Sequence, residues 1–360
     1  MPHSTSKGHW LNRRTVLKGA VAAGSLVASG PLFAQAKKFA GRELVFASWG
    51  GQYQDAQKVS YADPFTAETG AKIIQDGPTD EARIRTMVEM GKPTWDVVEV
   101  SLTFFHAGAK QGLFEKLDLS KLDTGKLDKI YVNEYGIGDV VTSFNIIYNT
   151  DLFKEGNRPK TWADIFDLKK FPGKRGFWNR ASPCLEAALL ADGVPKDKLY
   201  PLDTDRAFKK LNTIRDQTIF WDSHPKSQQL FIDGEVVIGG MNNGRIYDSM
   251  QKGAKNLGVE WNEGLLNAGY LVVPKGSKNL DVAHGFINSA LNPRNQAKLA
   301  DMTSYAPTNP DAIQYVKPDM VPWLTTTPAN VKGAVALDGA YWAENSKRLS
   351  DAWNAWKLGR

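Results

Sequence analysis

The chain contains a single cysteine, Cys184, among its 360 residues. A lone cysteine forms no internal disulfide and supplies no thiolate cluster for zinc, so neither device stabilises this fold. We expect Cys184 to pack as a small buried hydrophobic side chain. The alternative, a nucleophilic Cys184, needs a neighbouring base to activate it.

The motifs of nucleotide hydrolysis and of metal binding are also missing. There is no G-x-x-x-x-G-K-[ST] sequence, so ATP hydrolysis would have to come from a partner. His106, His224 and His284 are scattered and form no metal-ligand spacing such as H-x-x-x-H. We therefore expect no metal, no cofactor and no enzymatic activity. An enzyme would have to use Cys184 with Glu186 or one of these histidines as its general base.

Acidic residues are absent from the first 36 residues, which contain Lys7, Arg13, Arg14 and Lys18. The formal net charge of +6 therefore includes +4 from this segment, and the rest of the chain carries only +2. No run of lysine and arginine follows. A nearly neutral chain without a basic stripe does not have the electrostatic footprint of a nucleic-acid-binding protein, so we expect no such partner.

Residues 1–36 have the pattern of an export signal. Asn12–Lys18 contains the adjacent arginines, Gly19–Phe33 is mildly apolar, and Ala34-Gln35-Ala36 offers an A-x-A cleavage site. This resembles a twin-arginine signal, with a Sec signal as the alternative. The apolar stretch is short and glycine-rich for a lasting membrane anchor. We expect cleavage near Ala36 and a mature protein in the periplasm.

The first predicted unit of the mature chain is a strand, a glycine turn and a helix. Leu44–Ala47 is an apolar run typical of a strand buried on both faces, and Ser48–Gly51 (S-W-G-G) interrupts it. A helix is expected from Gln52, with a kink or break at Pro64. Because ligands bind at the carboxyl ends of parallel strands, we expect Trp49 at the mouth of a ligand cleft.

Strands and helices alternate along the rest of the chain, which predicts an α/β fold with parallel strands. A chain of 360 residues is long enough for two domains with separate cores. Strands are expected at 71–75, 95–100, 140–149, 174–178, 236–240 and 267–274, and helices at 80–90, 101–111, 161–166, 183–191, 205–215, 227–233 and 283–302.

Six short motifs then support a family resemblance. They are S-W-G-G at 48–51, P-F-T-A-E-T-G at 64–70, W-D-V-V-E-V-S at 95–101, F-P-G-K at 171–174, D-G-E-V-V-I-G at 233–239 and Y-A-P-T-N-P at 305–310. In this order they resemble the extracellular solute-binding proteins of ABC importers, closest to the spermidine/putrescine-binding branch. The resemblance covers essentially the whole mature chain.

This resemblance implies a two-lobed type II periplasmic-binding-protein fold with two crossing strands at the hinge. We expect residues 37–143 and 268–308 to form lobe 1, and residues 144–267 and 309–360 to form lobe 2. The lobes would close over a ligand by hinge motion. The family delivers its solute to a membrane permease powered by an ATPase, and we expect a monomer. A sensory subunit that presents ligand to a receptor would have the same sequence features.

The polyamine binders of this family carry acidic residues after two strands, and this chain does not. The corresponding positions hold Asn179 and Arg180 after the strand at 174–178, and Asn242, Asn243 and Arg245 after Met241. Arginine suits a carboxylate, because a guanidinium binds it with a bidentate fork. The alternative for each arginine is a surface ion pair.

The preferred ligand is therefore a small solute with a carboxylate and an amine, similar to γ-aminobutyrate or an amino acid, and a polyamine is the alternative. Ser101, at a helix start, would help to bind the carboxylate. Glu99, Asp222 and the ring of Trp49 or Trp221 would receive the ammonium. Two more residues of the predicted site have a structural alternative, namely Tyr305, which would otherwise pack at the hinge, and Asp338, which would otherwise cap a helix.

Overall fold

The computed structural model describes residues 37–359, so the predicted export signal lies outside the described residues. Residues Lys37–Arg360 form one compact unit. Among residues 37–359, no helix is long and apolar enough to span a membrane. The strands are β1 (Glu43–Ala47), β2 (Lys72–Asp76), β3 (Val97–Ser101), β4 (Val132–Asn133), β5 (Gly136–Asn149), β6 (Arg175–Trp178), β7 (Thr218–Trp221), β8 (Ile238–Asn242), β9 (Leu257–Val272), β10 (Ala306–Pro307) and β11 (Val335–Ala336).

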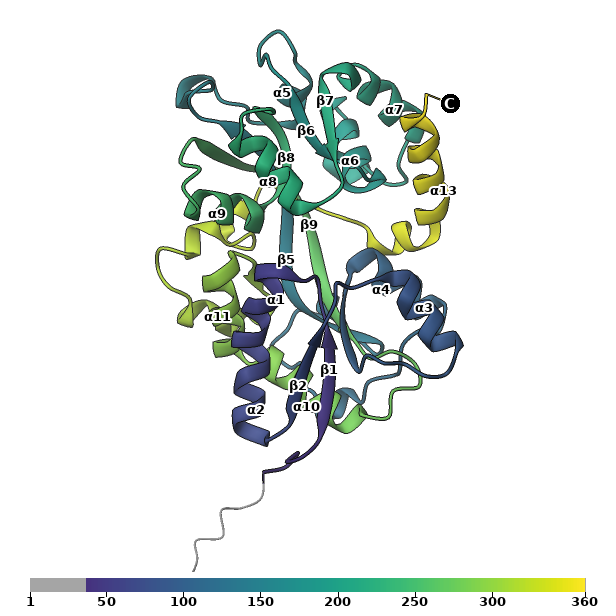
Figure 1. Cartoon of the computed structure of the whole chain (residues 1–360). Helices are drawn as coiled ribbons and strands as arrows, with labels where there is room; N and C mark the ends of the chain where they lie inside the picture. Colours follow the sequence, from purple (N-terminus) through teal and green to yellow (C-terminus); the bar gives the residue numbers. More distant parts are fainter. Residues whose placement is uncertain (1–36, 360) are drawn as a thin grey trace, which may run out of the picture. The chain divides into compact units, whose positions relative to one another are not determined.

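Helices alternate with these strands, as the sequence predicts (Figure 1). The α-helices are α1 (Gly51–Gln57), α2 (Asp63–Thr69), α3 (Glu81–Glu89), α4 (Leu102–Lys110), α5 (Trp162–Phe166), α6 (Ala181–Ala191), α7 (Thr204–Asn212), α8 (His224–Ile232), α9 (Asn243–Gln251), α10 (Leu280–Leu291), α11 (Pro293–Thr303), α12 (Pro328–Val331) and α13 (Gly339–Lys357).

The strands form one sheet in the order β2-β1-β3-β9-β5-β8-β6-β7. Strand β1 pairs in parallel with β2 and β3, and β6 pairs in parallel with β7 and β8. Between these two parallel groups, β5 and β9 pair with each other in antiparallel orientation. The parallel groups agree with the predicted α/β class.

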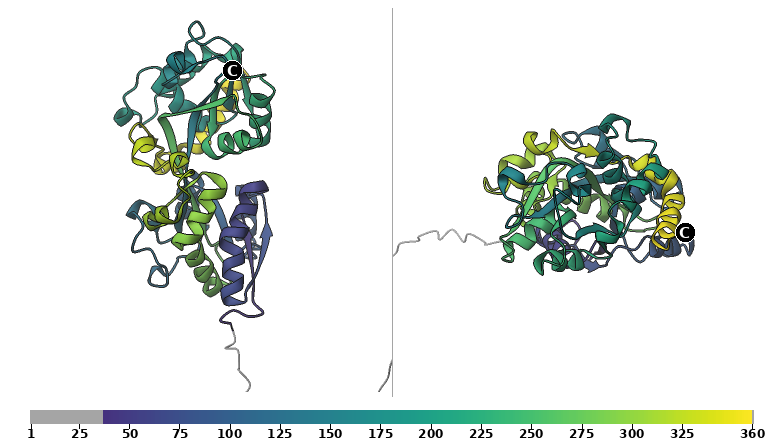
Figure 2. Two further views of the ribbon diagram at one scale, coloured as in Figure 1. Left: turned by 90° about the vertical axis from the view of Figure 1, so that its left-hand side faces the viewer. Right: turned by 90° about the horizontal axis from the view of Figure 1, so that it is seen from above.

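Strands β5 and β9 are long enough to cross from one parallel group to the other (Figure 1). Their pairing runs from Ile137 opposite Leu271 to Asn149 opposite Leu257, with a register shift between Phe144 and Ile146. The left view of Figure 2 shows the same division into two parts from another side. The predicted crossing strands are therefore present, although β9 begins ten residues before the predicted start at Asn267.

We call the part that contains β1–β3, α1–α4, α10 and α11 the first lobe, and the part that contains β6–β8, α5–α9 and α13 the second lobe. In β1, Leu44 and Phe46 pack into a core with α2 and α10, while Ala47 and Val45 pack with α3 and α4 on the opposite face. Strand β1 is thus buried from both sides, as its apolar run predicts.

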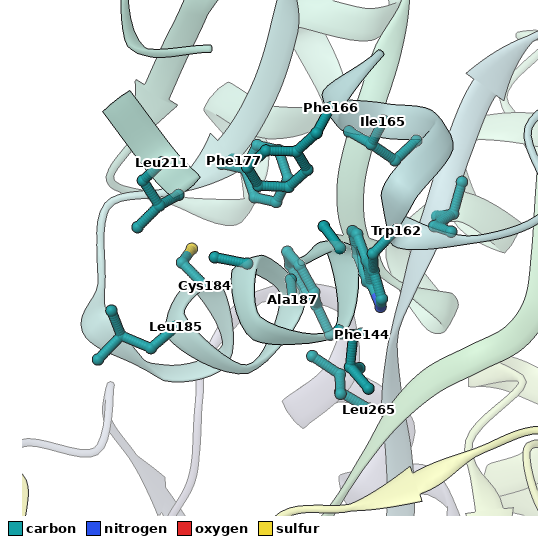
Figure 3. Packing of buried hydrophobic residues seen from close by; sticks show 14 of the residues in the cluster. Phe144, Trp162, Ile165, Phe166, Phe177, Cys184, Leu185, Ala187, Leu211 and Leu265 are labelled. Carbon is teal, nitrogen blue, oxygen red and sulfur yellow. The ribbon is translucent and has the colours of Figure 1, made fainter. Parts of the chain in front are cut away.

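The core of the second lobe surrounds α6 (Figure 3). Cys184, Leu185 and Ala187 of this helix pack with Phe177 of β6 and Leu211 of α7. The Cys184 side chain is fully buried, and its burial raises the pKa of the thiol well above the ordinary value. The position and protonation of Cys184 therefore match the predicted small hydrophobic residue.

A further cluster joins the chain after β10 to the first lobe. Ala312, Val316 and Leu324 pack with Ala297 of α11 and Val141 of β5. The predicted boundary places residues 309–360 in the second lobe, whereas this packing connects the stretch from 312 to 324 with α11. The lobe boundaries themselves stay a prediction.

The predicted kink or break at Pro64 has a specific form. Residues Lys58–Ala62 make a π-helical segment between α1 and α2, and Pro64 lies in the first turn of α2. The backbone stays helical from α1 through this segment into α2, and the Asp63 N–H bonds the Lys58 carbonyl just before the proline, so the pattern is widened rather than interrupted at Pro64. Strand β7 and helix α9, which had no sequence prediction, complete the second lobe together with α13, the helix that follows Asp338.

Candidate ligand-binding cleft

A cleft of ≈ 310 Å³ lies where residues of both lobes meet. Strands β3, β6 and β8 end there, and α4, α6 and α9 begin there. Such carboxyl-edge positions combine free backbone N–H groups with side chains from several elements. The cleft is lined by Glu81, Ser101, Thr103, Phe144, Trp178, Asn179, Arg180, Ala181, Ser182, Pro183, Asn242, Leu265, Asn267, Leu337, Trp342, Ser346, Ser350, Trp353 and Asn354.

Arg180 is the basic residue of this lining. It directly precedes α6, and its guanidinium lies over the Trp178 ring at 4.8 Å from the ring centroid. Among the described residues, no carboxylate lies within ion-pair distance of Arg180. The sequence alternative of a surface ion pair is therefore not what positions this arginine. Its charge is available in the cleft.

Two tryptophans stack behind Arg180. The rings of Trp178 and Trp221 lie 5.3 Å apart with an angle of 13° between their planes. Trp221 is only 1% exposed, and it is Trp178 that lines the cleft. His224 packs against both rings, and burial followed by the charges of Arg245 and Arg180 lowers its pKa to about 3. His224 is therefore neutral at physiological pH.

Asn179 connects three elements at the edge of the cleft. Its Nδ2 donates to Asp222 Oδ1 at 2.8 Å, and its Oδ1 accepts from Trp353 Nε1 of α13 at 3.0 Å. Asp222 itself is not among the residues that line the cleft. Of these two predicted site residues, Asn179 therefore lines the cleft, and Asp222 lies behind it and holds its amide.

The two asparagines after β8 have different environments. Asn242 lines the cleft, and its Oδ1 is buried without a hydrogen-bond partner among the described residues. Asn243 is fully buried, accepts from the Ser143 backbone N–H at 3.1 Å, and donates to the Ser304 carbonyl at 2.8 Å. Asn243 thus ties α9 to the crossing strand β5 and to the end of α11.

Arg245 and Tyr305 lie beside a second, smaller cavity of ≈ 20 Å³, together with Tyr53, Gly244 and Asp248. Tyr305 packs edge-on against Tyr53, with ring centroids 5.3 Å apart. The Arg245 Nε atom is buried and has no partner among the described residues. The two predicted arginines therefore line different cavities, and Tyr305 lines the smaller one while packing against Tyr53.

Ser101 and Asp338 both cap helices. Ser101 accepts from the Phe104 N–H at 3.2 Å at the start of α4, and it also lines the cleft. Asp338 accepts from the Tyr341 N–H at 2.8 Å at the start of α13 and does not line the cleft. Helix capping accounts for Asp338 by itself.

Trp49 lies outside both cavities and is 37% exposed. Its Nε1 donates to Glu99 Oε1 at 3.1 Å. Glu99 is buried and also accepts hydrogen bonds from the Tyr53 hydroxyl, the Ser48 hydroxyl and the Gln57 amide. Burial raises the pKa of Glu99 to about 7, although each of these donors acts to lower it.

Sequence reasoning missed two lining features. Glu81, at the start of α3, is the acidic residue of the lining, and Ser346, Ser350 and Asn354 present one face of α13 to the cleft. Glu81 follows the N-cap Asp80 just after β2, so its position at a strand's carboxyl end was a usable signal. Among residues 37–359, no group of three or more His, Cys, Asp or Glu side chains is arranged to hold a metal ion.

Comparisons with known proteins agree with this architecture. A family model described as bacterial extracellular solute-binding protein matches residues 60–331. The gamma-aminobutyric acid-binding protein of Pseudomonas aeruginosa PAO1 is 33% identical over 334 residues, covering 91% of this chain and 94% of that protein. The putrescine-binding periplasmic protein SpuD of Pseudomonas aeruginosa UCBPP-PA14 is 26% identical over 279 residues, covering 71% of this chain and 76% of that protein.

A solved structure, the Atu4243-GABA receptor, has 44% sequence identity and a TM-score of 0.82 to this chain. The match covers 88% of this chain and 98% of that one. The predicted two-lobed type II periplasmic-binding-protein fold and the predicted family are thereby confirmed. The chain belongs to the bacterial extracellular solute-binding proteins.

Proposed function

We propose that this protein captures γ-aminobutyrate, or an amino acid of similar size, in the cleft between its lobes and delivers it to an ABC importer. The relatives named for γ-aminobutyrate support this ligand class. The observation that carries the proposal is Arg180, a guanidinium in the cleft without a carboxylate partner among the described residues. A ligand carboxylate would complete its hydrogen bonding.

The surroundings of Arg180 suit an anion. Helix α9 begins directly after Asn242, whereas the first turn of α6 is irregular at Ser182 and Pro183. A helix N-terminus carries partial positive charge and unpaired N–H groups, so the start of α9 favours a carboxylate in the cleft. We propose Arg180, Ser101, Asn179 and Asn242 as ligand contacts.

The other predicted site residues would act behind these contacts. Two of them support the lining directly, because Trp221 stacks under Trp178 and Asp222 holds the Asn179 amide. We propose less direct roles for the rest of the predicted set: Trp49, Asn243 and Asp338 hold the turn after β1, α9 and α13 in place, and Arg245 and Tyr305 line the smaller cavity.

A polyamine is the weaker candidate. A diamine has an ammonium at each end and needs carboxylates to replace its water. Glu81 is the acidic residue among the described residues that line the cleft, and the fixed charge of Arg180 would repel a second ammonium. The putrescine-binding relative is also the less similar of the two curated relatives described above.

We further propose that residues 1–36 direct export and are removed near Ala36, so that the mature chain works in the periplasm as a monomer. Its partners would be a membrane permease and a cytoplasmic ATPase, and the two lobes would close over the ligand through the crossing strands β5 and β9.

Isothermal titration calorimetry tests the ligand class. The chain from residue 37 onward forms a compact unit by itself and is the protein to use. We expect γ-aminobutyrate to bind at one site and Arg180→Ala to weaken its binding by about 1.5–3 kcal/mol, a tenfold effect or more. Arg294→Ala, an exposed arginine of α11 outside both cavities, is the matched control. Tight putrescine binding by the parent, with no heat from γ-aminobutyrate, would refute the proposal.

A further inference from the structure

The lining of the cleft contains one negatively charged and one positively charged side chain. Among the described residues that line it, Glu81 and Arg180 are the charged ones, and all others are neutral polar or apolar. Glu81 comes from α3 of the first lobe, whereas Arg180 comes from the turn between β6 and α6 of the second lobe. The acid and the base therefore belong to opposite walls.

These two side chains act on each other without forming an ion pair. Glu81 is exposed to the cleft, partial desolvation raises the pKa of its carboxyl group, and the positive charge of Arg180 acts to lower it. Arg85 acts in the same direction as Arg180, but its guanidinium lies over the Phe104 ring and donates to Gln111. Arg180 is thus the basic group that Glu81 meets inside the cleft.

An acid in the first turn of a helix is stabilised by the helix dipole, which explains a carboxylate at the start of α3. It does not explain why this carboxylate shares a cleft with an arginine that has no other acidic partner. A single acid and a single base on opposite walls complement a molecule that carries one cation and one anion at its two ends.

We infer that Glu81 receives the ligand's ammonium group, so that the cleft selects zwitterions and fixes their direction, with the amine toward the first lobe and the carboxylate toward Arg180 of the second lobe. This inference rests on the proposed function and adds a residue and an orientation to it. A bound zwitterion links the two walls through its own charges, which couples binding to lobe closure. A simple carboxylate reaches Arg180 but leaves Glu81 unpaired, and a diamine reaches Glu81 but meets the charge of Arg180.

The test compares two ligands that differ only at one end, γ-aminobutyrate and 4-hydroxybutanoate, in calorimetric titrations up to millimolar ligand. The proteins are the parent, Glu81→Gln, and Glu89→Gln, which changes an exposed glutamate at the other end of the same helix. We expect Glu81→Gln to weaken γ-aminobutyrate binding by about tenfold or more. Its binding of 4-hydroxybutanoate should stay equal or become tighter, because Arg180 loses the competing negative charge. Glu89→Gln should match the parent.

The outcomes separate the two proposals. If the parent binds γ-aminobutyrate and Glu81→Gln binds it equally well, the role of Glu81 is refuted while the proposed function stands. An equal loss for both ligands would mean that Glu81 shapes the cleft rather than binding the ammonium, which also refutes the inference. If 4-hydroxybutanoate does not bind to the parent, the γ-aminobutyrate titration of Glu81→Gln alone decides. A parent that ignores γ-aminobutyrate contradicts the proposed function itself.

Discussion

Glu99 is a buried carboxylate that organises the turn after β1. It accepts hydrogen bonds from Ser48, Trp49 and Tyr53, which lie in that turn and in α1. Gly269 of β9 faces it, and a Cβ atom there would meet Glu99 Oε1 at 2.5 Å. Nearby Asp139 is also buried, and burial followed by the charge of Glu99 raises its pKa well above the ordinary value. Ionising the buried carboxyl groups of Glu99 and Asp139 is therefore unfavourable.

The raised pKa of Glu99 predicts a stability that depends on pH. The carboxyl ionises near 4.5 in the unfolded chain and at about 7 in the folded one. As the pH rises between these values, the unfolded chain loses its proton first, so the free energy of unfolding falls across this pH range. Glu99→Gln should remove this part of the pH dependence. Urea unfolding between pH 4.5 and 8 measures it, and equal pH slopes for parent and variant would contradict it.

The cap at Asp338 gives a second prediction. Its side chain accepts the Tyr341 N–H at the start of α13. Asp338→Ala should lower the free energy of unfolding by about 1 kcal/mol, whereas Asp338→Asn, which keeps a capping oxygen, should cost less. Thermal unfolding of both variants measures this effect. If the alanine variant were as stable as the parent, the cap would not explain this aspartate.

Single residues show where sequence reasoning succeeds and where it stops. It placed Arg180 and Asn242 at strand ends, because a strand's end and its following helix are visible in local patterns. It could not see that Trp221 lies beneath Trp178, since two rings at the ends of neighbouring strands look alike until the packing of the lobe is known. Likewise, local patterns could not show that Arg180 and Glu81 line the same cleft, because the two residues are far apart in the sequence and come from different lobes.

Among whole elements, α4 and α13 connect the two lobes on one side of the cleft. Lys110 of α4 and Glu344 of α13 form an exposed ion pair at 3.0 Å. Gly339, the first residue of α13, lies against α4, where a Cβ atom would meet side-chain atoms of Leu102 and His106 at 2.6 Å. The close approach of the two helices thus requires glycine at this position.

Gly339→Ala should therefore separate α4 from α13. This contact lies between the two lobes and not inside the hydrophobic core of either lobe, so we expect the variant to remain folded. Because closure of the lobes depends on such contacts, we expect it to bind γ-aminobutyrate several-fold more weakly. Calorimetry and a thermal melt measure the two effects. Gly125→Ala is the control, since a Cβ atom there meets no other atom within 4 Å. Unchanged affinity in Gly339→Ala would show that this contact does not limit closure.

Most elements could be predicted from hydrophobic patterns, and the exceptions have physical reasons. The first half of β9 contains polar residues such as Glu260 and Asn262, so its sequence does not look like a buried strand. It is a strand from Leu257 onward because it pairs there with β5. Helix α13 mixes buried tryptophans with serines that line the cleft, so its apolar periodicity is weak. Long-range pairing in one case and the cleft in the other override the local signal.

In the whole molecule, the crossing strands β5 and β9 provide the connection on which closure depends. Asn243 ties this connection to α9 and to the end of α11 through its two hydrogen bonds. The family resemblance predicted the two lobes and the crossing strands, and the sheet order confirms both. The position of residues 312–324 next to α11 arises from packing between distant segments, which no local motif records.

The central claim is that the cleft holds an amino acid by its carboxylate on Arg180. A crystal structure of the chain from residue 37 onward, grown with γ-aminobutyrate, tests this most directly. We predict the ligand between the lobes, with its carboxylate oxygens about 2.7–2.9 Å from the Arg180 guanidinium nitrogens and its ammonium facing Glu81. A ligand bound outside this cleft, or one with its ammonium beside Arg180, would contradict the account.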